Sequence, residues 1–155
     1  MATTTRADLA FLLSQASHAL ATEMTAGLAG LGITPREHCV LSKALGAEHT
    51  QTELADLCQL DKTTMVVTMD GLERAGLAER RLSSTDRRAR TIAVTEAGER
   101  VVAQSHAIIA AVYDDVLEAL PASEREGLVA GLERLVGGRL AKPVQCDRPP
   151  RRRAP

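Results

Sequence analysis

Aromatic side chains are nearly absent from this chain of 155 residues, which has one Phe, one Tyr and no Trp. A hydrophobic core must therefore be built from aliphatic residues and Met, which favours packed helices over an aromatic-rich sandwich or barrel. The scarcity also excludes a nucleic-acid surface of stacked aromatic rings. Hydrophobic residues make up 45% and charged residues 25%, a composition typical of a folded globular domain.

Cysteine pairs, long apolar runs and catalytic motifs are also missing. The three cysteines are odd in number and none forms a Cys-x-x-Cys pair, so we expect reduced thiols and no zinc finger. No apolar run approaches the length of a membrane span, and the polar N-terminus lacks a secretory pattern, so we expect a cytoplasmic protein without a membrane partner. No nucleophile elbow, phosphate loop or zinc-protease motif occurs, so we expect neither an enzyme nor a cofactor.

Positive charge is concentrated in two short segments, although the net charge of the chain is only −1. Residues 80–90 carry five Arg and one Asp, and residues 139–155 carry six Lys or Arg and one Asp. The other residues carry a net charge of −10. Like charges held close together repel one another, so such clusters indicate a surface that meets a polyanion. A polyanion is therefore the expected partner.

Helical spacing predicts one long helix from residue 8 to about residue 30. A capped start at Thr34-Pro35-Arg36-Glu37 predicts a second helix that ends near residue 45. A capping box at Thr50-Gln51-Thr52-Glu53 opens a short helix over 51–58, and Asp61 can cap another over 62–75. Two helices joined by a short turn form a helix-turn-helix pattern.

The helical spacing of apolar residues then ends. Two short β-prone runs follow, residues 77–82 and 91–95, and they flank an arginine-rich hairpin tip. A long helix follows from residue 95 or 96 until Pro121 breaks it, and Ser123 is expected to cap a last helix. From residue 141 onward, prolines and basic residues leave no core to fold, so we expect a basic disordered tail.

The helix over 62–75 matches the width of the DNA major groove, which it would enter by its N-terminal end. Groove contacts are expected from Lys62, Thr63, Thr64, Val66, Val67 and Thr68. The hairpin would straddle the phosphate ridge and reach the adjacent minor groove. It is expected to contribute Arg80 and Arg81 at phosphates, Arg87, Arg88 and Arg90 in the wing, and Asp86, whose carboxylate would brace an arginine and the turn.

Four stretches in this region form a recognisable series: Leu72-Glu73-Arg74-Ala75-Gly76-Leu77, Arg80-Arg81, Asp86-Arg87-Arg88 and Val94-Thr95-Glu96-Ala97-Gly98. Together they resemble the winged-helix signature of the MarR (multiple antibiotic resistance regulator) family, and the resemblance covers residues 8–140. Asp86 and Arg88 match the Asp-x-Arg element of that family's wing. Val94 stands where relatives usually have Leu.

The resemblance implies a mainly α (α+β) fold, a winged helix-turn-helix with long N- and C-terminal dimerisation helices. It implies a homodimeric repressor that binds double-stranded DNA at a pseudo-palindromic operator. We accordingly assign residues 1–33 and 96–140 to dimerisation, residues 34–95 to DNA binding, and residues 141–155 to the tail. The tail is either a DNA-binding arm or a solvated end.

Many relatives bind a small-molecule effector between the dimer helices and the winged domain. By resemblance, the candidates here are His18, Met24, His38 and Cys39, for which ordinary core packing and surface exposure are the competing interpretation. Two alternatives stay within the same fold: a zinc sensor using Glu37, His38 and His106, and a redox sensor using Cys39 or Cys58. A third alternative is a helical protein-interaction adaptor whose wing contacts protein.

Overall fold

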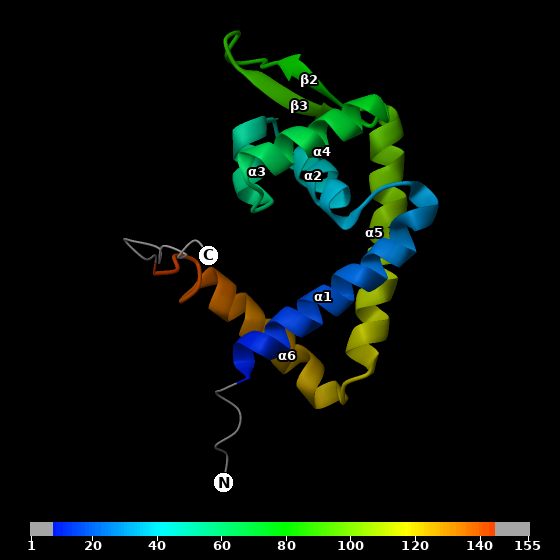
Figure 1. The fold of residues 1–155 in the computed structure, drawn as a ribbon, viewed down its shortest axis with the longest axis vertical. Coiled ribbons are helices and arrows are strands. Elements are labelled where there is room, and N and C mark those ends of the chain that lie inside the picture. The colour runs from blue at the N-terminus through cyan, green and yellow to red at the C-terminus, as the bar shows by residue number, and fades with distance from the viewer. Residues whose placement is uncertain (1–7, 145–155) are drawn as a thin grey trace, which may run out of the picture. The chain divides into compact units, whose positions relative to one another are not determined.

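The computed structural model describes residues 8–144, which divide into two compact units. The first unit ends at Tyr113 and the second begins at Asp114. The helices are α1 (Leu9–Leu28), the 3-10 turn η1 (Ala29–Leu31), α2 (Pro35–Gly46), α3 (Gln51–Leu57), α4 (Lys62–Arg74), α5 (Glu96–Glu118) and α6 (Ala122–Gly137) (Figure 1). The strands are β1 (His49–Thr50), β2 (Ala78–Leu82) and β3 (Arg90–Val94). The unit boundary therefore falls within α5.

Capping side chains set the starts of the helices in the first unit. Thr34 Oγ1 accepts a hydrogen bond from the Glu37 backbone N–H at 3.2 Å, and Glu37 Oε2 accepts one from the Thr34 N–H at 2.8 Å. The same reciprocal arrangement precedes α3, so both predicted capping boxes are confirmed. The prediction for the last helix was wrong: Pro121 is the N-cap of α6, and Ser123 lies inside the helix. Pro121 occupies the N-cap position without a side-chain cap, and Ser123 is already the second residue of the helix, so its side chain does not stand where a cap would.

The strands form one antiparallel sheet in the order β1-β3-β2. In the register, Arg80 of β2 and His49 of β1 both lie opposite Ile92 of β3. Figure 1 shows β2 and β3 as a hairpin beside the packed helices α2, α3 and α4. The predicted fold, mainly α with a winged helix-turn-helix, is confirmed.

The buried core of the described residues lies in the first unit. Its fully buried side chains come from α1, α2, α3, α4 and α5, and the largest are Leu28, Leu41, Leu54, Met65, Met69 and Leu72. Because α4 contributes three of these side chains at helical spacing, its opposite face is left for solvent or a partner.

Apolar side chains remain exposed on α1 in the first unit and on α6 in the second. On α1, Leu9, Phe11 and Leu12 are 54–62% exposed, and Leu28 is the buried residue of that helix. α6 has no buried residue and exposes Leu128, Val129, Leu132, Leu135 and Val136. Burying apolar surface releases about 25 cal/mol of free energy per Å². Exposed apolar faces of this kind are therefore typical of surfaces that bind another chain. Among the described helices, none combines the length and hydropathy needed to cross a membrane.

Candidate nucleic-acid interface

The first turn of α4 is fixed by Asp61 and carries exposed polar side chains. Asp61 Oδ1 accepts from the Thr64 N–H at 2.8 Å, and Oδ2 accepts from Thr64 Oγ1 at 2.6 Å. These hydrogen bonds, the Thr64 hydroxyl first, lower the pKa of the Asp61 carboxyl. Lys62 and Thr63 project into solvent. The predicted cap is therefore confirmed, and the turn that it holds is open to a ligand.

The middle of α4 is partly apolar on its outer face. Val66 and Val67 are 42% and 63% exposed. Thr68, predicted to contact DNA, is only 6% exposed, and its hydroxyl donates to the Thr64 carbonyl oxygen at 2.8 Å. Thr68 is one position past the exposed pair, where the helical turn faces the core, so its side chain is turned away from the outer face and bonds to the helix backbone.

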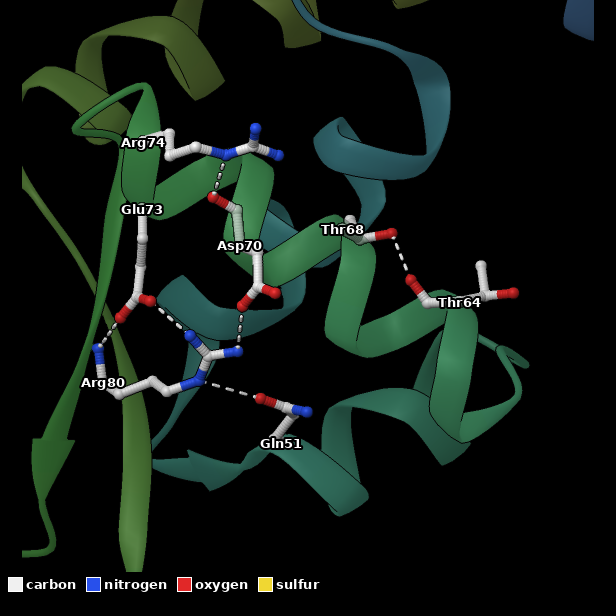
Figure 2. A network of polar contacts seen from close by, with 7 residues as sticks. All are labelled: Gln51, Thr64, Thr68, Asp70, Glu73, Arg74 and Arg80. Carbon is white, nitrogen blue, oxygen red and sulfur yellow. Dashed lines mark hydrogen bonds and ion pairs between the residues drawn. The ribbon is translucent and has the colours of Figure 1, made fainter.

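Side chains of α3 and α4 hold the guanidinium of Arg80 (Figure 2). Arg80 Nη2 lies 2.9 Å from Asp70 Oδ1, Nε donates to Gln51 Oε1 at 3.0 Å, and Nη1 pairs with Glu73 Oε2. The Arg80 backbone N–H also donates to Glu73 Oε1 at 2.9 Å. We call Gln51, Asp70, Glu73 and Arg80 the Arg80 cluster. The sequence led us to expect Arg80 at a phosphate, but the structure directs its charge to two acids of α4.

The hairpin tip is a turn built around side-chain acceptors. The Ser83 N–H donates to the Ala89 carbonyl at 2.9 Å, and Ser83 Oγ accepts from the Asp86 N–H at 3.2 Å. Asp86 Oδ1 accepts from the Arg88 N–H at 2.9 Å. Asp86 thus braces the backbone of the turn, as expected. Its expected pairing with a guanidinium is not among the ion pairs of residues 8–144.

Glu48, between α2 and β1, anchors the same turn to the helical part of the unit. Its Oε1 accepts from the Ser84 N–H at 2.9 Å and from Thr91 Oγ1 at 3.1 Å, while Oε2 accepts from Ser84 Oγ at 2.7 Å. These hydrogen bonds, the Ser84 hydroxyl first, lower the pKa of the Glu48 carboxyl. The wing is therefore tied to the α2–β1 connection near its tip.

The other arginines of the hairpin reach solvent. Arg81, Arg87, Arg88 and Arg90 are all exposed. Arg81 Nε pairs with Glu79 Oε1 on the same strand. In the part of the chain that the structure describes, no ion pair engages the other three. The tip therefore presents three cations without an acidic partner there, an arrangement suited to phosphate or to a narrow minor groove.

His38 links α2 to α5 through a chain of polar contacts. Ser105 Oγ donates to the Val102 carbonyl at 2.9 Å, which leaves its oxygen to accept from His38 Nδ1 at 2.7 Å. Ser42 Oγ lies 3.4 Å from His38 Nε2 and 3.2 Å from His106 Nε2, and the two rings meet edge to face. Burial, and then the nearness of His106, lower the pKa of His38. Among residues 8–144, no three His, Cys, Asp or Glu side chains gather as metal ligands.

The other candidate effector residues have separate surroundings. His18 is exposed on α1, and the half-buried Met24 accepts a contact from the Tyr113 hydroxyl at 3.8 Å. Cys39 and Cys58 are half-buried thiols on α2 and at the end of α3. Burial, and then contact with Cys39, raise the pKa of Cys58 to about 12. The Cys58 thiol is thus protonated at neutral pH, which disfavours its use as a nucleophile.

Comparison with known proteins agrees with this geometry. Residues 31–89 match the model of the MarR family. A MarR-family transcriptional regulator from Rhodococcus sp. RHA1 is 28% identical, with a TM-score of 0.74 over 83% of this chain and 91% of the other. The chain thus resembles MarR-family regulators in sequence over residues 31–89 and shares their fold over most of its length. Its α4 and β2–β3 hairpin are accordingly the recognition helix and wing of a MarR-type transcription-regulator fold.

Two other similar structures contain a bound partner molecule. CouR from Rhodococcus jostii RHA1, solved with p-coumaroyl-CoA, is 27% identical with a TM-score of 0.75, over 91% of this chain and 96% of that chain. The transcriptional repressor CouR bound to a 23-mer DNA duplex gives 25% identity and a TM-score of 0.76, over 83% and 92% of the two chains.

Four residues that shape the candidate interface were not predicted to do so: Gln51, Glu48, Asp70 and Glu73. Asp70 and Glu73 are one helical turn apart, ahead of the strand that carries Arg80. Two acids at that spacing lie on one face of a helix, where they can hold a cation, so the sequence did contain a signal for the Arg80 cluster. Glu48 gave no such signal, because its partners lie more than 30 positions away in the sequence.

Proposed function

We propose that this protein is a homodimeric transcription regulator of the MarR type, a repressor, that binds a pseudo-palindromic operator through α4 and the wing. One observation carries the proposal. A single winged-helix unit presents both an exposed first turn of α4 and a hairpin tip with three arginines that lack acidic partners among residues 8–144. The DNA complex of CouR supports it by analogy.

We assign direct DNA contacts to the exposed members of the predicted set. In the major groove these are Lys62, Thr63, Val66 and Val67, with the valine methyls placed to meet thymine methyls. Thr64 is half-buried and its hydroxyl donates to Asp61 Oδ2, so we assign it to holding this turn. Along the wing they are Arg81, Arg87, Arg88 and Arg90. Thr68, Asp86 and Arg80 contribute through the backbone and helices that they hold.

We propose that a second copy of the chain covers the exposed apolar faces of α1 and α6. This assigns residues 1–33 and 96–140 to dimerisation and residues 34–95 to DNA binding. A two-fold dimer requires half-sites whose centres are separated by about one helical turn of DNA, roughly 34–36 Å. The exposed leucines and valines of these helices support the proposal.

We further propose that a small lipophilic molecule releases the operator by changing the spacing between the two recognition helices. The p-coumaroyl-CoA bound by CouR supports a small-molecule effector by analogy, with its aryl acyl group as the lipophilic part. Met24, His38 and Cys39 are half-buried and remain the candidate contacts, with His18 at the surface. A thermal-shift screen of acyl-CoA thioesters and aryl acids tests this, and an effector must weaken operator binding as well as raise the melting temperature.

The direct test is DNA affinity as a function of salt for the wild type and Arg88→Ala. Because Arg88 is exposed at the wing tip, we expect the variant to lose about 1–3 kcal/mol of binding and to lower the salt slope by about one. Arg100→Ala is the matched control, since Arg100 is an exposed arginine paired with Glu96 on α5. DNA affinity that does not depend on salt, or is unaffected by Arg88→Ala, would instead favour a protein-binding adaptor.

A further inference from the structure

Arg80 differs from the other arginines of the hairpin region in where its donors point. Its side chain is 22% exposed, compared with 63% for Arg81 next to it. Three side-chain nitrogens and the backbone N–H of Arg80 all have partners, and these partners lie on α3 and α4 (Figure 2). The residue therefore connects the wing strand to both helices of the helix-turn-helix.

The charges of the Arg80 cluster argue against a phosphate contact. One guanidinium faces two carboxylates, Asp70 and Glu73, so the group has a net charge of −1. To meet a phosphate, Arg80 would have to leave both acids and also Gln51. Charge-assisted hydrogen bonds to the guanidinium are the strong members of such a network, so this exchange is unfavourable.

The positions of the partners suggest what the cluster controls. Gln51 is the first residue of α3, Asp70 and Glu73 lie in the second half of α4, and Arg80 is the central residue of β2. A planar guanidinium fixes the directions of its partners in a way that an ammonium does not. The exposed Thr63 lies seven residues before Asp70, about 10 Å along the helix axis. A small rotation of α4 at the cluster would therefore displace the side chains that reach the bases.

We propose that Arg80 is a specificity-determining positioning residue, which selects DNA sequence by fixing α4 against α3 and β2 and does not contact phosphate. The inference rests on the proposed function, because it needs a DNA operator to act on. It assigns Gln51, Asp70 and Glu73 to the same task. The wing arginines supply affinity for any duplex, and the Arg80 cluster sets which sequence is preferred.

Arg80→Lys tests this, because lysine keeps the charge and loses the planar fork. Affinity is measured for the genomic fragment that the wild type retains most strongly and for a scrambled duplex, each over a range of salt concentrations. We expect the operator-to-scrambled ratio to fall about tenfold, the loss typical of one misplaced base contact, with an unchanged salt slope. Arg100→Lys is the control, because Arg100 is exposed on α5 outside the proposed contacts, and we expect it to leave the ratio intact.

Glu73→Gln separates the two roles independently. If Arg80 contacts phosphate, removing its acidic partner frees the guanidinium and strengthens binding to every duplex. If Arg80 positions α4, Glu73→Gln lowers the operator-to-scrambled affinity ratio as Arg80→Lys does. The double variant then lowers this ratio little further than either single variant, because both remove the same interaction. Circular dichroism checks that all variants are folded.

An unchanged ratio in folded Arg80→Lys overturns the inference and leaves the proposed function standing. So does stronger binding of Glu73→Gln to both duplexes. Wild-type protein that binds neither duplex overturns the proposed function itself, and the inference with it.

Discussion

Gly98, at the start of α5, shows how the absence of one side chain allows a helix to approach a strand end. A Cβ at this position would lie 2.1 Å from the Leu77 carbonyl oxygen and 2.6 Å from Val94 Cγ1. The Gly98 N–H donates to Thr95 Oγ1 at 3.1 Å, and the Thr95 N–H donates to the Leu77 oxygen at 3.0 Å. The Thr-x-x-Gly spacing in the sequence therefore has a steric cause in the junction between wing and α5.

Gly98→Ala should destabilise the first unit by about 1–3 kcal/mol, because the methyl group overlaps backbone that cannot move aside easily. Gly127→Ala is the matched control, since nothing lies within 4 Å of a Cβ there and alanine favours a helix by up to about 1 kcal/mol. Urea denaturation of both variants measures the difference. Equal stability of Gly98→Ala and the wild type would mean that the contact is relieved at little cost.

Single residues also show the limit of sequence reasoning about the site. Spacing placed Lys62, Thr63 and Val67 on the outer face of α4, because helical period decides which side a residue takes. It did not reveal that Arg80 meets Asp70 and Glu73, because an arginine has the same pattern whether its partner is a carboxylate or a phosphate. Only the side-chain geometry distinguishes the two.

At the scale of elements, the order of elements and the starts of α2, α3 and α4 were predictable, since side-chain caps and hydrophobic period are local signals. The start of α6 was not, because no side chain caps it. The contact between α2 and α5 was not, because His38 and Ser105 are 67 positions apart. This contact joins the predicted DNA-binding region to the predicted dimerisation region. It is therefore a place where the two could influence each other.

Protonation of His38 should weaken the packing of α2 on α5. Burial and His106 lower the pKa of His38, so the folded state favours neutral imidazole. Its contribution to stability is present above the ordinary histidine pKa of about 6.5 and is lost as pH falls through the lower, folded-state pKa. Melting temperature should therefore fall less between pH 7 and pH 5 in His38→Asn than in the wild type.

The exposed His18 supplies the control for that measurement, because its replacement by Asn removes a histidine that lies outside the contact. The pH profile of His18→Asn should follow that of the wild type. A His38→Asn profile that also follows the wild type would contradict the assignment of the pH dependence to the α2–α5 contact.

At the scale of the whole molecule, the chain exposes more apolar helix surface than a monomer would be expected to. α6 has no buried residue, and Leu132 and Leu135 lie on it at 38% and 40% exposure. The sequence indicated this excess through apolar residues at helical spacing. The sequence alone does not define which residues form the dimer interface, because the interface also depends on how a second chain packs.

Leu132→Asp should convert a dimer of this 16.5 kDa chain into a monomer. The substitution removes little from the core of a single chain, since Leu132 is not buried in it, but it would place a charge in the proposed interface. Sedimentation equilibrium measures the mass, with the neighbouring exposed Glu133→Ala as control. A wild-type monomer, or a variant that stays dimeric, would contradict the assignment of α6 to the interface.

The most direct test of the dimeric DNA-binding regulator is to incubate the purified protein with fragmented genomic DNA from its source organism and to sequence what it retains. We predict enrichment of one palindrome of about two helical turns, with half-sites about one turn apart. Its position next to particular genes would then indicate what is regulated. Retention of fragments without a common sequence, or of no DNA, would contradict the account.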